Sequence, residues 1–462
     1  MATWQEILDS LGVMTDDILL PQEGTDMTKW AVVACDQYTS EPEYWLRVEA
    51  LVGQSPSTLR LIFPEVWLER EEDSRKRERI ATINRTMADY LAQGLLRAHR
   101  GPLLTERTTR HGQRRLGLML SLDLERYDFS AGSQSPIRAT EGTIIERLPP
   151  RVRIRESASL ELPHIMILID DPQRAVIEPL HAACIAGAEP GHADTVHSSD
   201  AIRPVYDFPL MEHSGHVRGW TIADKGLLDG MAASLARLAD PEAFARRYGT
   251  DGKTGVLLFA VGDGNHSLAT AKTCWNRIRE GLSEAARENH PARYALIELV
   301  NLHDDGLVFE PIHRVLFNAD HDVFSRDFAA WHAKRGIRTR IEPAVGENVP
   351  ADGEQTAVLI SPQGRERLVW ENPTQQLAVG SLQVFLDDWL ASRPQTTIDY
   401  VHGDDVTAHH GAEPGNLGLL LPVMEKEALF PTVIRDGALP RKTFSMGEAH
   451  EKRFYLECRK IR

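Results

Sequence analysis

The sequence predicts an α+β protein with mixed sheets and helices, and three observations support this fold class. Helical and strand-like segments follow one another without the strict alternation of a doubly wound sheet. Hydrophobic residues make up 42% of the 462 residues and charged residues 26%, as in an ordinary globular protein with a large core. This length favours two or three domains. We expect an N-terminal α+β region over residues 1–318, carrying the site, and a C-terminal α+β region over residues 319–462.

Apolar periodicity locates the elements in order along the chain. Segments with helical spacing lie at residues 3–11, 40 onward, 69–96, 174–188, 225–238, 241–248, 266–280, 323–334 and 381–389. Short apolar or β-branched runs predict strands at residues 30–35, 103–126, 164–169, 205–210, 217–222, 255–261, 294–301 and 454–461. Residues 138–156 are charged but β-branched, and a strand there would place Arg151, Arg153 and Arg155 on one face. That row could face an anion, or it could be a solvated strand edge.

Composition and simple motifs exclude several classes of protein. The formal net charge of −15 argues against a nonspecific nucleic-acid binder, which needs a basic face. The four cysteines are scattered, which suits a reducing compartment. The start of the sequence lacks a signal-peptide pattern, and the apolar runs are too short to span a bilayer. We therefore expect a cytoplasmic protein whose partner is a small-molecule substrate rather than a nucleic acid or a membrane.

Known metal and nucleotide motifs are missing from the sequence. It contains no H-E-x-x-H segment, no paired-cysteine motif, no Walker A sequence and no G-x-S-x-G elbow. The sequence thus leaves any metal ligands unidentified, and it leaves the oligomeric state open.

The most distinctive motif is a polar glycine turn between an apolar strand and a helix. The strand at residues 255–261 runs directly into Gly262, Asp263, Gly264, Asn265, His266 and Ser267. Glycines can adopt positive φ, and the free amides at a helix start form an anion site. Asp263 could hold a metal ion or a substrate amine, and His266 could donate to a phosphate or move a proton. The alternative is a structural turn in which Asn265 caps the helix.

Further polar residues near predicted strand ends and glycines are candidates for the same site. Asp36 ends a strand, although it could equally form an Asx turn before the next helix. Arg138 and Glu141 lie beside Gly142, and Arg147 follows them. The secondary candidates are His303, His313, Arg314 and Lys442. The alternative interpretation is that they are structural histidines or solvent-exposed positions without a role in the site.

Several separated segments together resemble one protein family over nearly the whole chain. They lie at residues 31–38, 141–143, 262–267, 301–314 and 442–445, in the expected order. On these segments the chain resembles the DUF1015 family of uncharacterised bacterial and archaeal proteins.

The glycine turn is also similar to a more remote family. The pattern Asp263-Gly264-x-His266 resembles the D-G-H-H-R turn of free serine kinases in the ParB/sulfiredoxin-like superfamily, which holds nucleotide phosphates at the head of a helix. The resemblance implies a ParB/sulfiredoxin-like core. Two positions depart from that pattern, because Asn265 replaces a histidine and Ser267 replaces an arginine. The departure removes a bidentate phosphate contact, so another arginine would have to supply the charge.

The resemblance and the anion turn together favour a small-molecule phosphotransferase, similar to a free serine kinase. It would use Mg²⁺ with ATP, ADP or pyrophosphate. The expected catalytic residues are Glu141, His266 and Asp263. The expected phosphate-binding residues are Gly262, Gly264, Asn265, Ser267, Arg138 and Arg147. Two alternatives remain, a hydrolase of phosphate esters or nucleotides and a nonenzymatic ligand-binding regulator.

Overall fold

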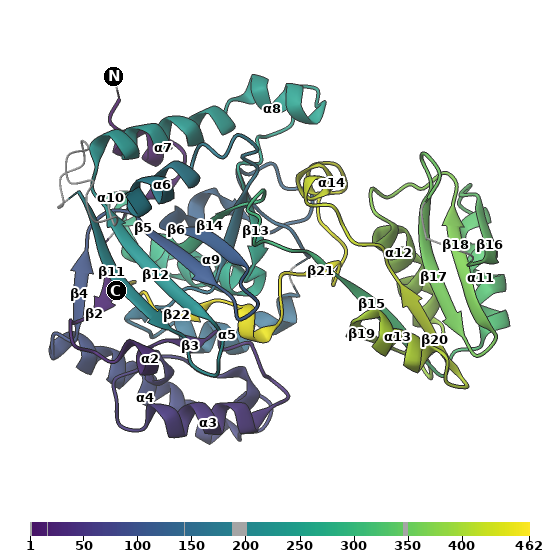
Figure 1. Cartoon of the computed structure of the whole chain (residues 1–462), viewed down its shortest axis with the longest axis horizontal. Coiled ribbons are helices and arrows are strands. Elements are labelled where there is room, and N and C mark those ends of the chain that lie inside the picture. Colours follow the sequence, from purple (N-terminus) through teal and green to yellow (C-terminus); the bar gives the residue numbers. More distant parts are fainter. Residues whose placement is uncertain (1, 16, 143, 187–200, 345–349) are drawn as a thin grey trace. The chain divides into compact units, whose positions relative to one another are not determined.

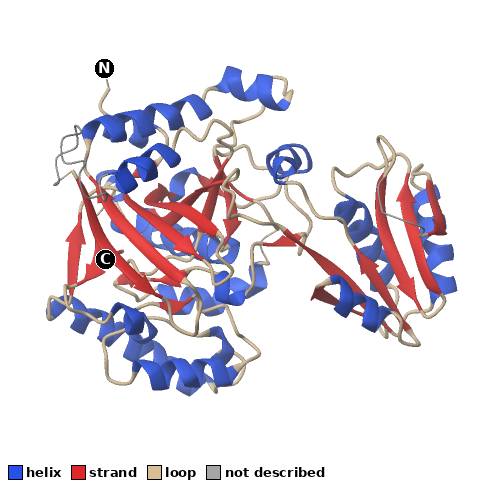
Figure 2. Ribbon diagram, in the orientation of Figure 1, coloured by secondary structure: helices blue, strands red, loops and turns tan. Residues whose placement is uncertain are grey.

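The chain folds into two units that each combine helices with mixed strands (Figures 1 and 2). A computed structural model describes residues 2–15, 17–142, 144–186, 201–344 and 350–462. The first unit comprises Met1–Leu307 with Gly447–Arg462, and the second comprises Val308–Met446. The α+β fold class is therefore confirmed.

The division between the units differs from the expected boundary at residues 318 and 319. Strand β15 (Glu310–Phe317) pairs with strands β19 (Thr397–His402) and β20 (Asn416–Leu420), so the second unit already includes residues before the expected boundary. The final segment of the chain belongs to the first unit, where β22 (Phe454–Tyr455) pairs with β3 (Val32–Val33). Such long-range strand pairing leaves no local signal in the sequence.

The first unit is built on a ten-stranded mixed sheet. Its strands lie in the order β11-β12-β5-β6-β14-β10-β13-β8-β7, and β1 pairs with β6. They span β1 (Val13–Met14), β5 (Leu103–Thr108), β6 (Arg114–Asp123), β7 (Tyr127–Asp128), β8 (Ile137–Ala139), β10 (Met166–Ile169), β11 (Ile202–Pro209), β12 (His216–Ile222), β13 (Phe259–Asp263) and β14 (Tyr294–Asn301). Strand β13 is parallel to β8 and antiparallel to β10, so β8 and β13 end at the edge where β10 begins.

Each face of this sheet carries its own hydrophobic core. Consecutive residues point to opposite faces, so Leu104 packs into one core and Leu103 into the other. The first core includes residues of helices α1 (Trp4–Ser10), α6 (Glu178–Ala186), α7 (Lys225–Leu238) and α9 (Asn265–Glu280). The second includes residues of α2 (Met27–Trp30), α3 (Pro42–Val52), α4 (Asp73–Ala92), β3 and β22. The sheet is therefore a middle layer, and the segment containing β22 packs on the face opposite α9.

The remaining elements of the first unit are short. Besides several 3-10 turns, they are the helices α5 (Leu148–Arg155), α8 (Pro241–Tyr248) and α10 (Glu284–Glu288), and the paired strands β2 (Ile18–Pro21) with β4 (Leu96–His99) and β9 (Leu160–Glu161) with β23 (Arg459–Lys460). No helix in the described part of the chain combines the length and apolarity needed to cross a membrane.

Three predicted strands need correction. Residues 148–155 form helix α5, because two prolines in its first turn are compatible with a helix start. The three arginines therefore do not form a row on a strand; Arg151 pairs with Glu65 at 2.6 Å and Arg155 pairs with Glu161. The expected strand at 30–35 is reduced to β3, which follows the one-turn helix α2, and the expected strand at 454–461 is split into β22 and β23.

The second unit contains a seven-stranded sheet in the order β16-β18-β17-β20-β15-β19, with β21 paired to β15. Its other strands span β16 (Thr339–Pro343), β17 (Gln355–Ser361), β18 (Gly364–Trp370) and β21 (Phe444–Ser445). Its helices are α11 (His321–Ala333), α12 (Ala378–Ala391), α13 (Asp404–Gly411) and α14 (Leu429–Asp436). The apolar side chains of α11 and α12 share one core with the sheet.

Candidate functional site

The glycine turn lies at the sheet edge where β8 and β13 both end. Val261 on β13 is paired with Ala139 on β8. Thr140, the first residue after β8, connects that strand to β13 and the turn. Its hydroxyl donates to the Val261 carbonyl at 2.6 Å, and its amide donates to Asn265 Oδ1 at 3.3 Å. Glu141 follows Thr140 directly, so the structure brings Glu141 beside the glycine turn.

The start of helix α9 has no side-chain cap. Gly264 is the N-cap residue, with φ of 80° in the left-handed region, and as a glycine it has no side chain that could accept the amide hydrogens of the first turn. A Cβ atom on Gly264 would lie 3.0 Å from Ile165 Cα, so glycine is needed here for space as well as for conformation. Asn265 is the first helical residue rather than the cap. The positive end of the α9 dipole thus has a glycine cap, an arrangement that occurs at helix ends that bind anions.

Asp263 is held by a cation from the other end of the sequence. Its Oδ2 lies 2.9 Å from Lys452 Nζ, and its Oδ1 accepts the Gly264 amide hydrogen at 2.8 Å. Burial by itself would raise the pKa of Asp263, but Lys452, with smaller help from His164 and the Gly264 amide, holds it below its usual value. The positive charge at the turn thus comes from Lys452, a residue that the sequence did not single out.

His164 links two hydroxyl groups at the same edge. Its Nε2 lies 2.9 Å from Ser267 Oγ, and its Nδ1 lies 2.6 Å from the Tyr455 hydroxyl. The Tyr455 hydroxyl is also 3.1 Å from Cys35 Sγ, and Asp36 Oδ2 is 3.8 Å from His164 Nε2. Because hydroxyl groups both donate and accept hydrogen bonds, this hydrogen-bonded network allows the proton of the neutral His164 ring to lie on either nitrogen.

Further acidic and basic groups surround the hydrogen-bonded network of His164. Burial raises the pKa of Cys35, and Glu65 and Asp36 raise it further, so the group stays a neutral thiol at neutral pH. Burial also raises the pKa of Glu65, although Arg151 at 2.6 Å opposes the shift. A buried cluster of ionisable groups with shifted pKa values is typical of a functional site.

The sequence predicted that Arg138 or Arg147 would supply charge to the turn, and the guanidinium of Arg138 lies elsewhere. The buried Arg138 guanidinium donates to the carbonyl oxygens of Ser135, at 2.7 Å, and Gly255. Both carbonyls precede their strands, at the sheet edge opposite the turn, and burial lowers the pKa of Arg138 to about 10. Arg147 is exposed in a short 3-10 turn, and its carbonyl accepts a hydrogen bond from Arg151.

The secondary candidates lie in other places. His303 belongs to the first unit, where its Nε2 lies 2.7 Å from Asp170 Oδ1. His313, Arg314 and Lys442 belong to the second unit. Arg314 is fully buried there and donates to the Gln383 side chain. These contacts do not involve Asp263 or His164, whereas Asp36 lies 3.8 Å from His164 Nε2.

Sequence reasoning missed His164, Glu65, Lys452 and Tyr455. His164 begins a segment predicted as a strand, and that position beside the glycine-turn strand is the one signal that could have identified it. Lys452 lies 189 residues from its partner Asp263, and Tyr455 lies 291 residues from His164. Such pairs leave no local pattern.

Comparison with solved structures finds partial likenesses. A conserved hypothetical protein from Pyrococcus furiosus is 16% identical, with a TM-score of 0.29, over 44% of this chain and 75% of that chain. Free serine kinase in complex with AMP is 9% identical, with a TM-score of 0.37, over 73% of this chain and 90% of that chain. A mutant free serine kinase in complex with ADP is 14% identical, with a TM-score of 0.31, over 43% and 72% of the two chains.

Sequence comparison is more decisive. No curated protein sequence matches the chain. The family model described as "Protein of unknown function (DUF1015)" matches residues 19–387, which is well over half of the chain. On this match, and in agreement with the resemblance of its separated segments, the chain belongs to the DUF1015 family.

Proposed function

We propose that the first unit is a nucleotide-dependent phosphotransferase that phosphorylates the hydroxyl group of a small metabolite, with L-serine as the first substrate to test. The observation that carries this proposal is the α9 N-terminus without a side-chain cap, beside Lys452 and a group of carboxylates. Phosphoryl transfer depends on positioning and charge neutralisation more than on covalent chemistry of the protein, and these groups provide both.

The phosphate would lie against the first amides of α9. Gly264 lets it approach the backbone closely, and the helix dipole favours its negative charge. Lys452 would interact with both Asp263 and the phosphate. It would thereby supply the positive charge of the arginine that Ser267 replaces. Asp36 offers an oxygen ligand of the type that Mg²⁺ prefers, and a bound Mg²⁺ would neutralise phosphate charge.

The attacking hydroxyl must lose its proton as the new bond to phosphorus forms. His164 is one candidate acceptor, because Tyr455 fixes its Nδ1 while Nε2 faces Ser267. Glu141, two residues after the end of β8, is the other, because its neighbour Thr140 contacts Val261 and Asn265 at the turn. His266, in the first turn of α9, would contact the transferring group.

The test is direct. Purified protein is incubated with Mg²⁺ and ATP, ADP or pyrophosphate, together with L-serine and other hydroxylated metabolites, and phosphate esters are sought by mass spectrometry. Lys452→Met should reduce turnover by about 10²–10³, as expected for loss of a contact to transition-state charge. Lys460→Met is the matched control, because Lys460 is exposed on β23 and should leave turnover unchanged. Equal turnover in the two variants would refute the assigned phosphate site.

One observation favours a second candidate, a hydrolase of phosphate esters or nucleotides. The 2.9 Å contact between Ser267 Oγ and His164 Nε2 is the geometry of an activated hydroxyl or of a base that could accept a proton from water. Nucleotide loss without any acceptor, abolished in His164→Ala, would favour the hydrolase. Absence of binding to every nucleotide and phosphorylated compound tested would leave the ligand-binding regulator.

A further inference from the structure

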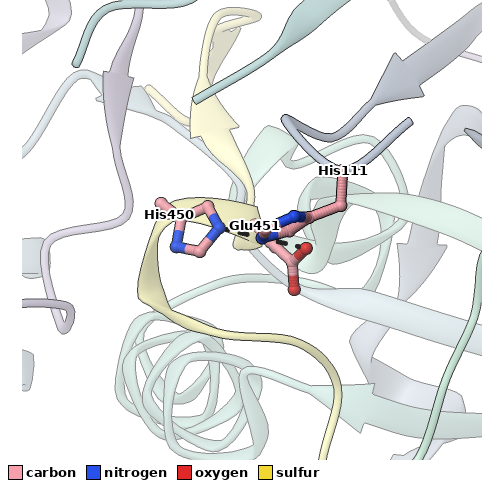
Figure 3. A group of neighbouring side chains, drawn as sticks. All are labelled: His111, His450 and Glu451. Atoms are coloured by element: carbon pink, nitrogen blue, oxygen red, sulfur yellow. Dashed lines mark ion pairs between the residues drawn. The ribbon is translucent and has the colours of Figure 1, made fainter. Parts of the chain in front are cut away.

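The C-terminal segment of the first unit brings two potential metal ligands next to a third from a distant hairpin. His450 and Glu451 lie in the 3-10 turn Ala449–Glu451, just before Lys452. His111 lies in the turn that joins β5 to β6 (Figure 3). One nitrogen from each histidine and one oxygen of Glu451 all lie within 4.8 Å of one another.

His450 carries the strongest indication of a ligand. Its side chain is 8% exposed, and its Nε2 is buried and has no hydrogen-bond partner among the described residues. Its Nδ1 lies 3.2 Å from Glu448 Oε2, so Nδ1 is positioned to donate its hydrogen to that carboxylate. This tautomer leaves the Nε2 lone pair facing Glu451 Oε1, 4.0 Å away. A carboxylate behind a histidine is the usual support of a metal-binding imidazole.

Glu451 is also held in place for binding. Its Oε2 accepts the Glu448 amide hydrogen at 3.0 Å, so Oε1 remains on the side of His450. Gly447 makes room for this carboxylate, because a Cβ atom at that position would lie 2.6 Å from Glu451 Oε2. The carboxylate is therefore fixed by the backbone around it.

His111 is the member of the group that lies on the surface. It is exposed, and its Nε2 accepts a hydrogen bond from Arg110 Nε at 3.1 Å. Arg110 is itself half-exposed, so a metal ion bound by His111 would displace a surface contact rather than a buried one. The ligand atoms of a tetrahedral zinc site lie about 3.4 Å apart, given metal–ligand distances of about 2.0–2.1 Å. A small movement of the exposed turn would therefore bring the three ligands to binding distance.

The surrounding charges permit a cation. Glu448 and Glu451 contribute two carboxylates, which offset the two guanidinium groups nearby: Arg107 donates to the His450 carbonyl, and Arg110 lies 3.7 Å from Glu448. A second group, His409, His410 and Glu413 in the second unit, also has ligand atoms within 4.8 Å of one another. No side chain of that group is buried, so it serves as a control rather than a candidate.

We propose that His111, His450 and Glu451 bind one divalent transition-metal ion, with Zn²⁺ as the ion to test, and that this ion fastens the C-terminal segment to the β5–β6 turn. Two imidazoles and one carboxylate form a known zinc ligand set that leaves a position for water. The same segment supplies Lys452 to Asp263 and Tyr455 to His164, so the ion would stabilise the backbone that carries both side chains. Metal binding itself does not depend on the proposed phosphotransfer.

The experiment titrates chelator-treated full-length protein with Zn²⁺ by calorimetry, and with Co²⁺ by absorption spectroscopy. We expect one site per chain, lost in His111→Ala and in Glu451→Gln. His111→Ala changes an exposed residue, so it keeps the test valid if changes at buried His450 prevent folding. Glu448→Gln should weaken affinity about 10–100-fold, as expected for a residue that supports a ligand. The control His409→Ala/His410→Ala should bind as the wild type does.

Hydrogen exchange supplies an independent readout. Zn²⁺ should slow amide exchange in residues 448–455 and 109–113 of the wild type but not of His111→Ala. The proposal is overturned if the wild type binds no more Zn²⁺ than His111→Ala, or if the high-affinity site disappears in the His409/His410 variant instead.

Discussion

Two histidines, His164 in the first unit and His313 in the second, use both ring nitrogens in different ways. The Leu421 amide donates to His313 Nδ1 at 3.1 Å, so its proton is on Nε2, which lies 2.7 Å from Asp404 Oδ1. That backbone contact fixes one tautomer. His164 instead lies between the hydroxyls of Ser267 and Tyr455, which can both donate and accept.

The difference teaches how to separate a structural histidine from a chemical one. Both were equally ordinary in the sequence, and only His313 was chosen there as a candidate. A histidine that accepts a hydrogen bond from a backbone amide connects elements of the fold, as His313 connects β15 to the segment after β20. A histidine between hydroxyls, near a carboxylate at 3.8 Å, is suited to moving a proton.

The largest expected effect is on catalysis by the first unit. His164→Ala should reduce turnover of the proposed phosphotransfer by about 10²–10⁴, the usual contribution of a general acid or base. The fold should survive, because Tyr455 keeps its contact with Cys35. Turnover under saturating substrate and thermal unfolding of the same sample check this. Unchanged turnover in a folded variant would show that His164 is as structural as His313.

The reciprocal change should act on stability. His313→Ala should lower the unfolding free energy of the second unit by about 2–3 kcal/mol, because it leaves the buried Leu421 amide without its acceptor and creates a cavity. Hydrogen exchange of β15 and β20 measures the loss. The exposed His409→Ala is the control and should change it by less than about 0.5 kcal/mol. A similar loss in both variants would contradict the assignment.

Removal of the Tyr455 hydroxyl should have a smaller effect on turnover and should test whether this group tunes His164. Tyr455→Phe removes the partner of His164 Nδ1 and should reduce turnover about 2- to 10-fold, the value of one hydrogen bond, while changing the pH profile. Tyr44→Phe is the matched control, because the buried Tyr44 hydroxyl has no hydrogen-bond partner among the described residues. If both variants show the same pH profile as the wild type, the hydroxyl does not tune His164.

The smallest effect concerns pH. Burial lowers the pKa of His313, although Asp404 opposes the shift, so protonation favours the unfolded chain. The contribution of His313 to the stability of the second unit should therefore be constant above its unfolded pKa of about 6.5 and should fall as the pH drops below that value. Burial shifts His332 in the same direction. His313→Asn should lose part of this acid dependence in hydrogen exchange, and an unaltered dependence would assign all of it to other groups.

The sequence by itself determined the elements whose signals are local. The predicted helices at 225–238 and 241–248 and the strand at 294–301 match α7, α8 and β14 to the residue, because apolar periodicity and capping act over a few residues. The glycine turn before α9 was equally readable, since it ends one strand and starts one helix. Residues 148–155 show the limit of that approach, because their β-branched side chains suggested a strand where two prolines start a helix.

Only the tertiary structure decided which charges meet at the turn. The sequence offered Arg138 for this role, but the sheet holds its guanidinium at the opposite edge. Lys452 takes the position, because β22 pairs with β3 on one face of the sheet and so places the preceding residues beside Asp263. Such an arrangement depends on strand pairing and register between segments hundreds of residues apart. Those are set by the packing of the whole unit rather than by any short stretch of sequence.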